Sequence, residues 1–552
     1  MNQRMAELLV GPMLRYVGER DATVWVETDA PCEVEVCGVR EPTFAVNGHH
    51  YALLCIDDLE PGASREYEVR LDGELRWPKP GSELPPSCIR TLSPDTPLRI
   101  SFGSCRQALP IEHPYTLSKD EHDEGAEVDA LHVLARELVR DPENRYPNLL
   151  MLLGDQVYVD EGSPEVREFI RSRRDTSKPP FEEVLDFEEY TRLYRESWTE
   201  PLVRWLFSTV PTAMVIDDHD MSDDWNISRS WVAEMNEKDW WHTRVEAGFA
   251  TYWLYQHLGN LSPAELADDG TLQAVKAAGG DATDIVLDYA RRAHGDRDGV
   301  RWSFHRDLCG TRVIVMDNRG GRVLERDRRS IFDDEEREWV WSQAKGDFDH
   351  LLIATSDPFL MTRTFHYLEA WNERLADGIW GMPIARLSER LRRAVDFDHW
   401  PAFGFSFAKM TEMLRRTGAG EFGEPPASIV ILSGDVHHAY LAEMAFRRGA
   451  GVKSAVYQAV CSPFRNPLDE SERRVIRASL TKPAEAIARG LARLAGVPDP
   501  DVRWRFTEGP YFDNQVGTLR LEGRSAELTL EKTVPGETDE SSLRTSFRRR
   551  LA

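Results

Sequence analysis

The sequence contains no apolar run that approaches 18 residues and no CxxC motif. The first absence predicts that no helix crosses a membrane. The 7 cysteines are scattered singly and their number is odd, which in a chain of 552 residues indicates reduced thiols and not a disulfide framework. The first residues have neither an apolar segment with a cleavage site nor a twin-arginine pair. We therefore expect a cytoplasmic protein.

Acidic residues outnumber basic ones: the chain has 68 Lys and Arg and 94 Asp and Glu, and its formal net charge is −26. This balance argues against general nucleic-acid binding and against a basic protein of the membrane surface. It leaves anionic substrates open, since a buried metal ion reverses the field locally. Hydrophobic residues make up 41% of the chain, enough for a large core, so a mainly disordered chain is excluded.

Three common catalytic signatures are missing. The chain has no P-loop, no GxSxG sequence and no GxGxxG sequence after a strand-like segment. These absences argue against P-loop NTPases, α/β-hydrolases and Rossmann dehydrogenases. The chemistry must therefore come from other residues.

The chain divides into regions of different texture. Short strand-like stretches separated by turn signals predict an N-terminal β-sandwich of immunoglobulin or fibronectin type; in one of them Glu33 and Glu35 alternate with valines. From Leu98 onward, apolar strands alternate with helical patterns, which predicts an α/β domain around a buried, largely parallel sheet. We predict a tail at 1–12, the sandwich at 13–97, the α/β domain at 98–535 with helical insertions near 360–425 and 468–500, and a C-terminal tail at 536–552.

Five of the predicted core strands share one feature: each is followed by a residue that can bind a metal or act in catalysis. In open α/β sheets the functional site lies beyond the carboxyl ends of the strands. An Asp after a strand also commonly caps the next helix, and any one of these residues taken alone could do only that. Packing does not require five strands to end in this way. The residues are Cys105, Asp155, Asp218 with His219, Asp317, and Asp435 with His437.

The second strand end has the sequence Gly154-Asp155-Gln156-Val157-Tyr158. The two carboxylate oxygens of Asp155 can bridge two cations. Tyr158 can point the same way if the chain turns into a helix there. A phenolate is a ligand for a trivalent ion and not for magnesium. The alternative for Tyr158 is an aromatic ring packed over the end of the sheet.

The third strand end has the sequence Asp217-Asp218-His219-Asp220. Adjacent carboxylates repel each other and raise their pKa values unless a cation lies between them, so a positive group is expected here. His219 beside a metal-held carboxylate can donate a proton to a leaving oxygen or stabilise charge on a phosphoryl group. The alternative is a hydrogen-bonded core histidine. Asp223 and Asp224 in the same loop either ligate a second metal or are solvated.

The last strand end contributes an Asp and two His residues. Alternation along an extended chain sends Asp435 and His437 to one side, so both can reach a single ion, and His438 to the other, where it supports them or packs. Aspartate and imidazole suit iron, zinc or manganese. Cys105, after the first strand, is a small buried hydrophobe when taken alone. Next to the other strand ends it becomes a candidate thiolate ligand.

Five motifs in this order resemble those of the PhoD family, the alkaline phosphatase D branch of the metallophosphatases (calcineurin-like phosphoesterases). They are Phe102-Gly-Ser-Cys-Arg106, Gly154-Asp-Gln-Val-Tyr158, Asp217-Asp-His-Asp220, Asp317-Asn-Arg319 and Ser433-Gly-Asp-Val-His-His438. Each motif alone is weak, but five in sequence order at strand ends are specific. The resemblance covers residues 13–535. It implies a metallophosphatase-type layered β-sheet core flanked by helices, preceded by a β-sandwich.

The resemblance implies a centre of two or more metal ions that hydrolyses phosphate esters by in-line attack of a metal-bound hydroxide. It implies one ferric ion and neighbouring divalent metal, which is calcium in the family. Free calcium is scarce in cytoplasm, so manganese, zinc or magnesium are alternatives. The implied ferric ligands are Cys105, Asp155, Tyr158 and Asp218, and the implied divalent-metal ligands are Asp435 and His437.

The resemblance also implies roles in catalysis. His219 takes the place of the catalytic histidine, and Asp218, also a candidate catalytic residue, takes the place of a metal-binding asparagine. Arg319 is a substrate-binding phosphate clamp. The expected partner is a phosphate-ester substrate, with nucleic acid only as a possible substrate. Two other functions stay open: a phosphodiesterase that acts on nucleotides or phospholipids, and a non-catalytic metal-binding protein on the same fold. The second alternative predicts gaps in the ligand set, and the sequence has none.

Overall fold

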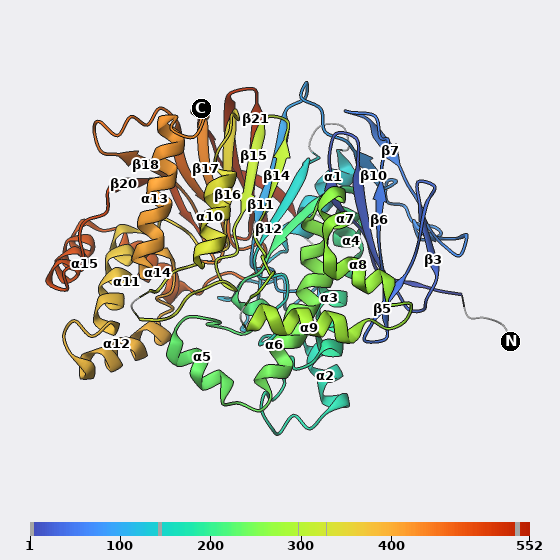
Figure 1. Cartoon of the computed structure of the whole chain (residues 1–552), viewed down its shortest axis with the longest axis horizontal. Helices are drawn as coiled ribbons and strands as arrows, with labels where there is room; N and C mark the ends of the chain where they lie inside the picture. Colours follow the sequence, from blue (N-terminus) through green and yellow to red (C-terminus); the bar gives the residue numbers. More distant parts are fainter. Residues whose placement is uncertain (1–4, 142–145, 296, 327, 536–540) are drawn as a thin grey trace.

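The computed structural model describes residues 5–141, 146–295, 297–326, 328–535 and 541–552 (Figure 1). Its N-terminal region contains two four-stranded sheets, ordered β1-β2-β6-β5 and β4-β3-β8-β9, and a β10-β7 pair. The strands of this region are β1 (Leu8–Val17), β2 (Ala22–Thr28), β3 (Glu33–Val36), β4 (Val39–Pro42), β5 (Phe44–Val46), β6 (His49–Ile56), β7 (Ser64–Glu66), β8 (Val69–Leu71), β9 (Glu74–Trp77) and β10 (Cys88–Arg90).

The two N-terminal sheets share a core. Val24 and Val26 of β2 and Val34 and Val36 of β3 are completely buried in it. In β3 the glutamates alternate with these valines and are more exposed, as the period of two in the sequence predicts. The β-rich character predicted for this region is therefore confirmed.

The first strand begins inside the segment predicted to be a tail at 1–12, so that prediction is wrong. β1 starts at Leu8 and pairs with β2 in an antiparallel ladder. Gly11 and Pro12 lie at an irregularity of the ladder, where Gly11 has a φ of 86° and the strand continues. The Gly11 carbonyl accepts a hydrogen bond of 2.6 Å from Arg204, which connects β1 to helix α4 (Pro201–Thr209).

Two larger mixed sheets form the centre of the molecule. The first has the order β13-β12-β11-β21-β22-β23 and the second β14-β15-β16-β17-β19-β18-β20. Strands β11 to β13 are mutually parallel, as are β15, β16, β17 and β19. The bounds are β11 (Leu98–Gly103), β12 (Leu149–Leu153), β13 (Thr212–Val215), β14 (Phe304–Leu308), β15 (Thr311–Val315), β16 (His350–Ala354), β17 (Ser428–Ser433), β18 (Ala439–Phe446), β19 (Ala455–Val460), β20 (Val502–Tyr511), β21 (Gln515–Glu522), β22 (Ser525–Val534) and β23 (Ser542–Arg550).

The inner faces of these two sheets pack against each other. Ile100 and Met151 of the first sheet belong to the same buried cluster as Leu352 and Val430 of the second. The prediction of one largely parallel sheet is therefore only partly right. The parallel strands exist, but they are divided between two sheets, and antiparallel strands complete each sheet because short connections such as that between β21 and β22 favour hairpins.

The C-terminal segment 536–552 was predicted to be a tail, and its described part is a strand. β23 pairs with β22 along the edge of the first sheet. Phe547 packs against Tyr511 with ring centroids 5.7 Å apart, and Leu551 is buried. Basic residues on an edge strand can face solvent while the intervening side chains pack, which explains a strand in a sequence that ends in arginines.

Helices cover the outer faces of both sheets. In Figure 1, α1, α3 and α4 lie between the N-terminal strands and the first sheet. The helices are α1 (Ala130–Arg140), α2 (Pro164–Arg173), α3 (Phe187–Thr199), α4, η1 (Asp218–Asp220), α5 (Arg229–Asn236), α6 (Trp241–Thr251), the π-helix η2 (Tyr252–His257), η3 (Leu258–Asn260), α7 (Pro263–Asp268), α8 (Gly270–Ala277), α9 (Thr283–His294), α10 (Asp334–Gln343), α11 (Arg363–Ala376), α12 (Met382–Ala394), η4 (Trp400–Ala402), α13 (Gly404–Ala419), α14 (Glu470–Ser479) and α15 (Lys482–Leu494).

The two stretches predicted to be helical, 360–425 and 468–500, contain α11 to α13 and α14 with α15. Their amphipathic spacing is thus a reliable signal. Across the described residues, none of the helices has both the length and the apolar character needed to span a bilayer.

Candidate metal centre

The chain turns sharply after three of the central strands. β11, β12 and β17 are followed by Cys105, by Asp155, and by Asp435 with His437. All four residues have a left-handed backbone, with φ values of 55°, 52°, 64° and 49° in that order. Non-glycine residues adopt this region at an energetic cost, and such positions concentrate at functional sites. The strand ends predicted from the sequence therefore also have unusual backbone geometry.

Two glycines allow these strand ends to come close to each other. A Cβ atom on Gly434 would lie 2.1 Å from Ser104 Oγ, and one on Gly154 would lie 2.7 Å from the Cβ of Asp217. Neither contact is sterically possible, so a side chain at either position would push the segments apart. The glycines thus set the distance between β11, β12, β13 and β17 at the site.

A first group of metal-binding atoms comes from Cys105, Asp155 and His437, whose ligand atoms lie within 4.8 Å of one another. Tyr158 is close to them: its hydroxyl donates to Asp155 Oδ2 over 3.3 Å and accepts from the Asn466 amide over 3.2 Å. Tyr158 reaches Asp155 from an irregular segment and not from the helix that the sequence suggested. Burial, reinforced by Asp155, raises the pKa of the Cys105 thiol well above its usual value.

A second group is formed by Asp155, Asp217 and Asp218, again with ligand atoms within 4.8 Å. Asp155 therefore belongs to both groups, in the position of a bridging carboxylate. In the described part of the chain, Asp155 Oδ1 and Asp217 Oδ2 are buried and have no hydrogen-bond partner. Burial, with a contribution from neighbouring carboxylates, raises the pKa values of Asp155 and Asp217 well above normal. Buried oxygens without donors in an acidic cluster fit a bound cation.

His219 lies on η1, directly after Asp218, and its ring packs against Tyr158 with centroids 4.6 Å apart. Its Nδ1 atom lies 2.9 Å from Asp160 Oδ1, so the imidazole can donate a proton there. Burial alone would lower the pKa of His219, but Asp160 and the nearby acids raise it well above 6.5. Asp160 therefore orients the ring and favours the imidazolium form, and Nε2 on the other side lies 3.9 Å from Asp223 Oδ1.

Asp435 and His437 do not extend from one straight strand. β17 ends at Ser433, and both residues have positive φ values, so the alternation assumed from the sequence does not apply to them. Among the described residues, Asp435 groups with Asp217 and Asp357, whereas His437 groups with the Cys105 thiol. That Asp435 and His437 bind the same ion stays a prediction.

Arg319, predicted to clamp phosphate, is enclosed by acids in this structure. Its side chain is 2% exposed. Burial alone would lower the pKa of Arg319, but the surrounding carboxylates raise it well above its usual value. The guanidinium is thus the internal counter-ion of the cluster, and its contact with substrate stays a prediction. The carboxylates within 3.5 Å of its nitrogens are those of Asp217, Asp218, Asp357, Asp398 and Asp435.

Sequence reasoning missed three residues of this cluster. Asp357 follows β16 by three residues, so the strand-end rule would have found it had it been applied to that strand. Asp398 and His399 follow α12, and no strand signals them. His399 Nε2 lies 3.2 Å from Asp435 Oδ2. Burial would raise the pKa of Asp435, but this histidine and Arg319 lower it.

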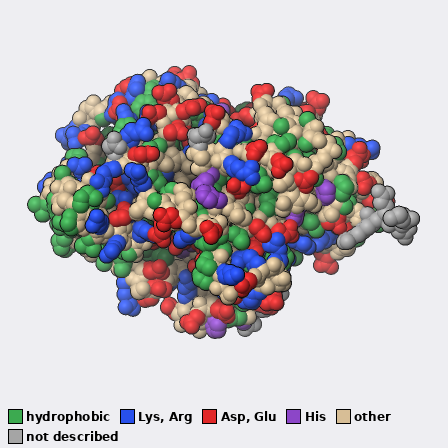
Figure 2. Space-filling model, turned by 60° about the horizontal axis from the view of Figure 1, so that its bottom comes forward, with side chains coloured by type: hydrophobic (Ala, Val, Ile, Leu, Met, Phe, Trp, Pro, Cys, Tyr) green, Lys and Arg blue, Asp and Glu red, His purple; other side chains and the backbone are tan. Residues whose placement is uncertain are grey.

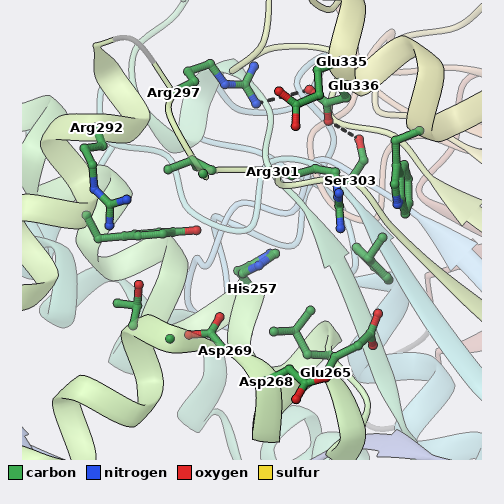
Figure 3. Close-up of a pocket in the computed structure, with 18 of the residues that line it drawn as sticks. His257, Glu265, Asp268, Asp269, Arg292, Arg297, Arg301, Ser303, Glu335 and Glu336 are labelled. Atoms are coloured by element: carbon green, nitrogen blue, oxygen red, sulfur yellow. Dashed lines mark hydrogen bonds and ion pairs between the residues drawn. The ribbon is translucent and has the colours of Figure 1, made fainter.

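The fifth strand-end residue, Asp317, has a different environment. Its Oδ1 accepts backbone hydrogen bonds from Arg319 at 3.0 Å and Gly320 at 2.8 Å, and its Oδ2 accepts one from Arg297 at 3.3 Å. With these donors Asp317 shapes the loop that contains Arg319. Arg297 in turn lines a separate cavity of about 720 Å³ with His257 (Figure 3). That cavity contains none of the predicted metal ligands, so we do not assign the chemistry to it.

Comparison with known proteins identifies the family. A family model described as PhoD-like phosphatase matches residues 134–492, which is more than half of the chain. The chain belongs to the PhoD-like phosphatase family. A second model, a domain of unknown function (DUF7800), matches residues 5–89. This PhoD-like phosphatase has no match among the curated proteins.

A solved structure entitled "Structure of PhoD" resembles the whole of this PhoD-like phosphatase. The likeness covers 100% of this chain and 93% of that chain, with a TM-score of 0.60 and 12% sequence identity. At that identity it concerns the fold alone. The family match includes Asp155, His219 and Asp435, and Cys105 lies before its first residue.

Proposed function

We propose that this PhoD-like phosphatase is a metal-dependent phosphoesterase that uses the centre described above. The observation that supports this best is the shared position of Asp155 in two adjoining groups of ligand atoms, each within 4.8 Å. A carboxylate common to two groups suits a centre of two or more ions, which metal-assisted phosphoester hydrolysis commonly uses. The phosphoesterase activity follows from the family, and the metal dependence is the proposal.

The ligand set favours one trivalent and one divalent ion. A thiolate, a phenolate and two carboxylates in one pocket carry up to four negative charges, which suits ferric iron better than magnesium or calcium. Calcium, manganese, zinc or magnesium then occupies the second position. The proposed ferric ligands are Cys105, Asp155, Tyr158 and Asp218. The proposed divalent-metal ligands are Asp435 and His437, although the ligand atom of His437 also lies within 4.8 Å of those of Cys105 and Asp155. Bound ions would activate a water molecule and neutralise charge on the phosphoryl group.

Residues of the chain itself would handle the proton and position the substrate. His219, held by Asp160 through Nδ1 at 2.9 Å, would donate its other proton to the leaving oxygen. Asp218 keeps this histidine next to the proposed metal pocket, because the two residues are adjacent on η1. Arg319 would bind a phosphate oxygen once cations replace it as the partner of the surrounding carboxylates.

We also propose a fold type for the N-terminal sheets and for the central sheets. We assign the N-terminal region to the immunoglobulin or fibronectin type and the central sheets to the metallophosphatase type. In both regions two sheets pack face to face over a shared core, which supports these assignments.

Elemental analysis together with turnover tests the proposal. The wild-type protein should contain iron and a divalent metal and should hydrolyse a chromogenic phosphate monoester or diester, and the two substrates decide between the two activities. Asp155→Asn should lower metal content and activity together. His219→Ala should keep the metals and lose activity about 10²-fold. The exposed His242, which contacts His294, provides a matched His→Ala control.

Native turnover by the His219→Ala variant would disprove the role of that residue. A wild-type protein that binds metal but hydrolyses neither ester would favour the non-catalytic alternative.

A further inference from the structure

Most of the exposed large hydrophobic side chains of the described residues lie at one end of the molecule. We call residues 363–395 and 470–494, which contain α11, α12, α14 and α15, the helical lobe; it lies at the left of Figure 1. Among the described residues, fourteen large hydrophobic side chains are exposed, and eleven of them belong to this lobe. Figure 2 shows hydrophobic side chains gathered at the same end, with Lys and Arg beside them. Such a concentration marks an interaction surface.

The helical lobe is also basic, although the chain as a whole is acidic. Its two segments contain twelve Arg and Lys residues and seven Asp and Glu residues, a formal charge of +5. Because the whole chain has a charge of −26, the remainder has a charge of −31. The net charge therefore hides a basic end, and the argument against a membrane-surface protein does not apply to this lobe.

Helix α12 shows the arrangement most clearly. Ala385, Ser388 and Arg392 are its buried residues. Leu387 is 66% exposed and Leu391 is 36% exposed, and their spacing of four places them in one stripe. The exposed face thus has an apolar stripe beside a basic one. The apolar stripe consists of Ile384, Leu387 and Leu391. The basic stripe consists of the exposed Arg386 and Arg390 and the partly exposed Arg393, which pairs with Glu234.

The helical lobe has cations that the protein does not neutralise. Arg386, Arg390 and Lys482 are exposed, and within the described ranges no ion pair or hydrogen bond involves their side chains. On α15 two apolar residues are exposed to a similar or greater degree, with Ile487 at 66% and Leu494 at 73%. An amphipathic helix with arginines next to leucines is the type that lies in the plane of a bilayer interface.

We propose that the helical lobe docks on the surface of an anionic lipid bilayer. The apolar side chains would enter the boundary between headgroups and acyl chains, and the unpaired cations would contact anionic headgroups. Charge complementarity favours this partner over a second copy of the chain, because two lobes of charge +5 would repel each other. Binding to lipid does not depend on the proposed catalytic function.

The helical lobe is connected to the metal centre at two points. α11 begins six residues after Asp357, and α12 ends four residues before Asp398. Docking by the lobe would therefore hold helices that join directly to segments of the acid cluster.

Co-sedimentation of the full chain with vesicles tests the proposal, with vesicles of phosphatidylcholine alone and with added phosphatidylglycerol. We expect binding to the anionic vesicles that weakens when salt is raised. Leu387→Gln with Ile487→Gln, and separately Arg386→Gln with Arg390→Gln, should each lower the partition coefficient about tenfold. The positions are exposed, so the fold should persist, and far-UV circular dichroism checks it.

Two controls isolate the lobe. Phe181 is 54% exposed outside it, and Arg503 is exposed on β20; Phe181→Gln and Arg503→Gln should bind vesicles like the wild type. Failure of the wild-type protein to bind anionic vesicles would overturn the proposal, as would equal binding by the lobe variants. Sedimentation equilibrium in the same buffer would then show whether the lobe instead holds two copies together.

Discussion

His49 at the start of β6 joins the N-terminal region to the rest of the molecule. Its Nδ1 lies 2.8 Å from Glu27 Oε1 on β2, and its Nε2 lies 2.9 Å from Glu188 Oε2 on α3. A neutral imidazole has one proton and can donate to only one of these carboxylates, so the full bridge requires the imidazolium form. Burial lowers the pKa of His49, but the two glutamates outweigh it and raise the pKa to about 9.

This shift determines both the size and the sign of a pH effect on stability. The rise from 6.5 to about 9 would correspond to about 3 kcal/mol without screening. Glu188 is 41% exposed, so solvent weakens its half of the bridge, and we expect on the order of 1–2 kcal/mol. Because the folded-state pKa is the higher one, the stabilisation is complete below the unfolded-state pKa of 6.5 and is lost as the pH rises through about 9.

Urea unfolding of the wild-type protein and of His49→Gln, at about pH 6 and about pH 10, measures this contribution. The free energies of unfolding should differ by about 1–2 kcal/mol at the lower pH and converge at the higher one. His113 is exposed, so His113→Gln serves as the control and should match the wild type at both values. A difference that is the same at both pH values, or that is absent at the lower one, would refute the reasoning.

Two further predictions concern the metal centre. Iron-loaded protein should show a phenolate-to-iron absorption band, and Tyr158→Phe should bleach that band. The control is Tyr190→Phe, at a buried tyrosine whose hydroxyl donates to a backbone carbonyl, and it should leave the band in place. A colourless protein with only zinc or magnesium would remove the ferric assignment. Gly434→Ala should lower the free energy of unfolding by about 1–3 kcal/mol and reduce metal content, because the new Cβ would overlap Ser104 Oγ. Gly404→Ala is the control, since a Cβ there meets open space. Equal melting temperatures for the two variants would contradict this prediction.

Local patterns were enough to predict much of the site. An apolar run followed by a polar residue is visible within a few positions, and it correctly placed Cys105, Asp155 and Asp218 after β11, β12 and β13. The alternation in β3 was equally local. The predicted tail at 1–12 is wrong because β1 runs through Gly11 and Pro12, which the ladder absorbs as an irregularity inside the strand.

The sequence by itself determined most of the strand ends at the site and the two long helical stretches, because hydrophobic periodicity depends on near neighbours along the chain. Only the tertiary structure decided that Asp435 groups with Asp217 and Asp357. The same holds for Arg319, which lies among acids from several distant segments. These contacts depend on how the two sheets pack, and the distance between residues far apart in the sequence is not encoded in any local pattern.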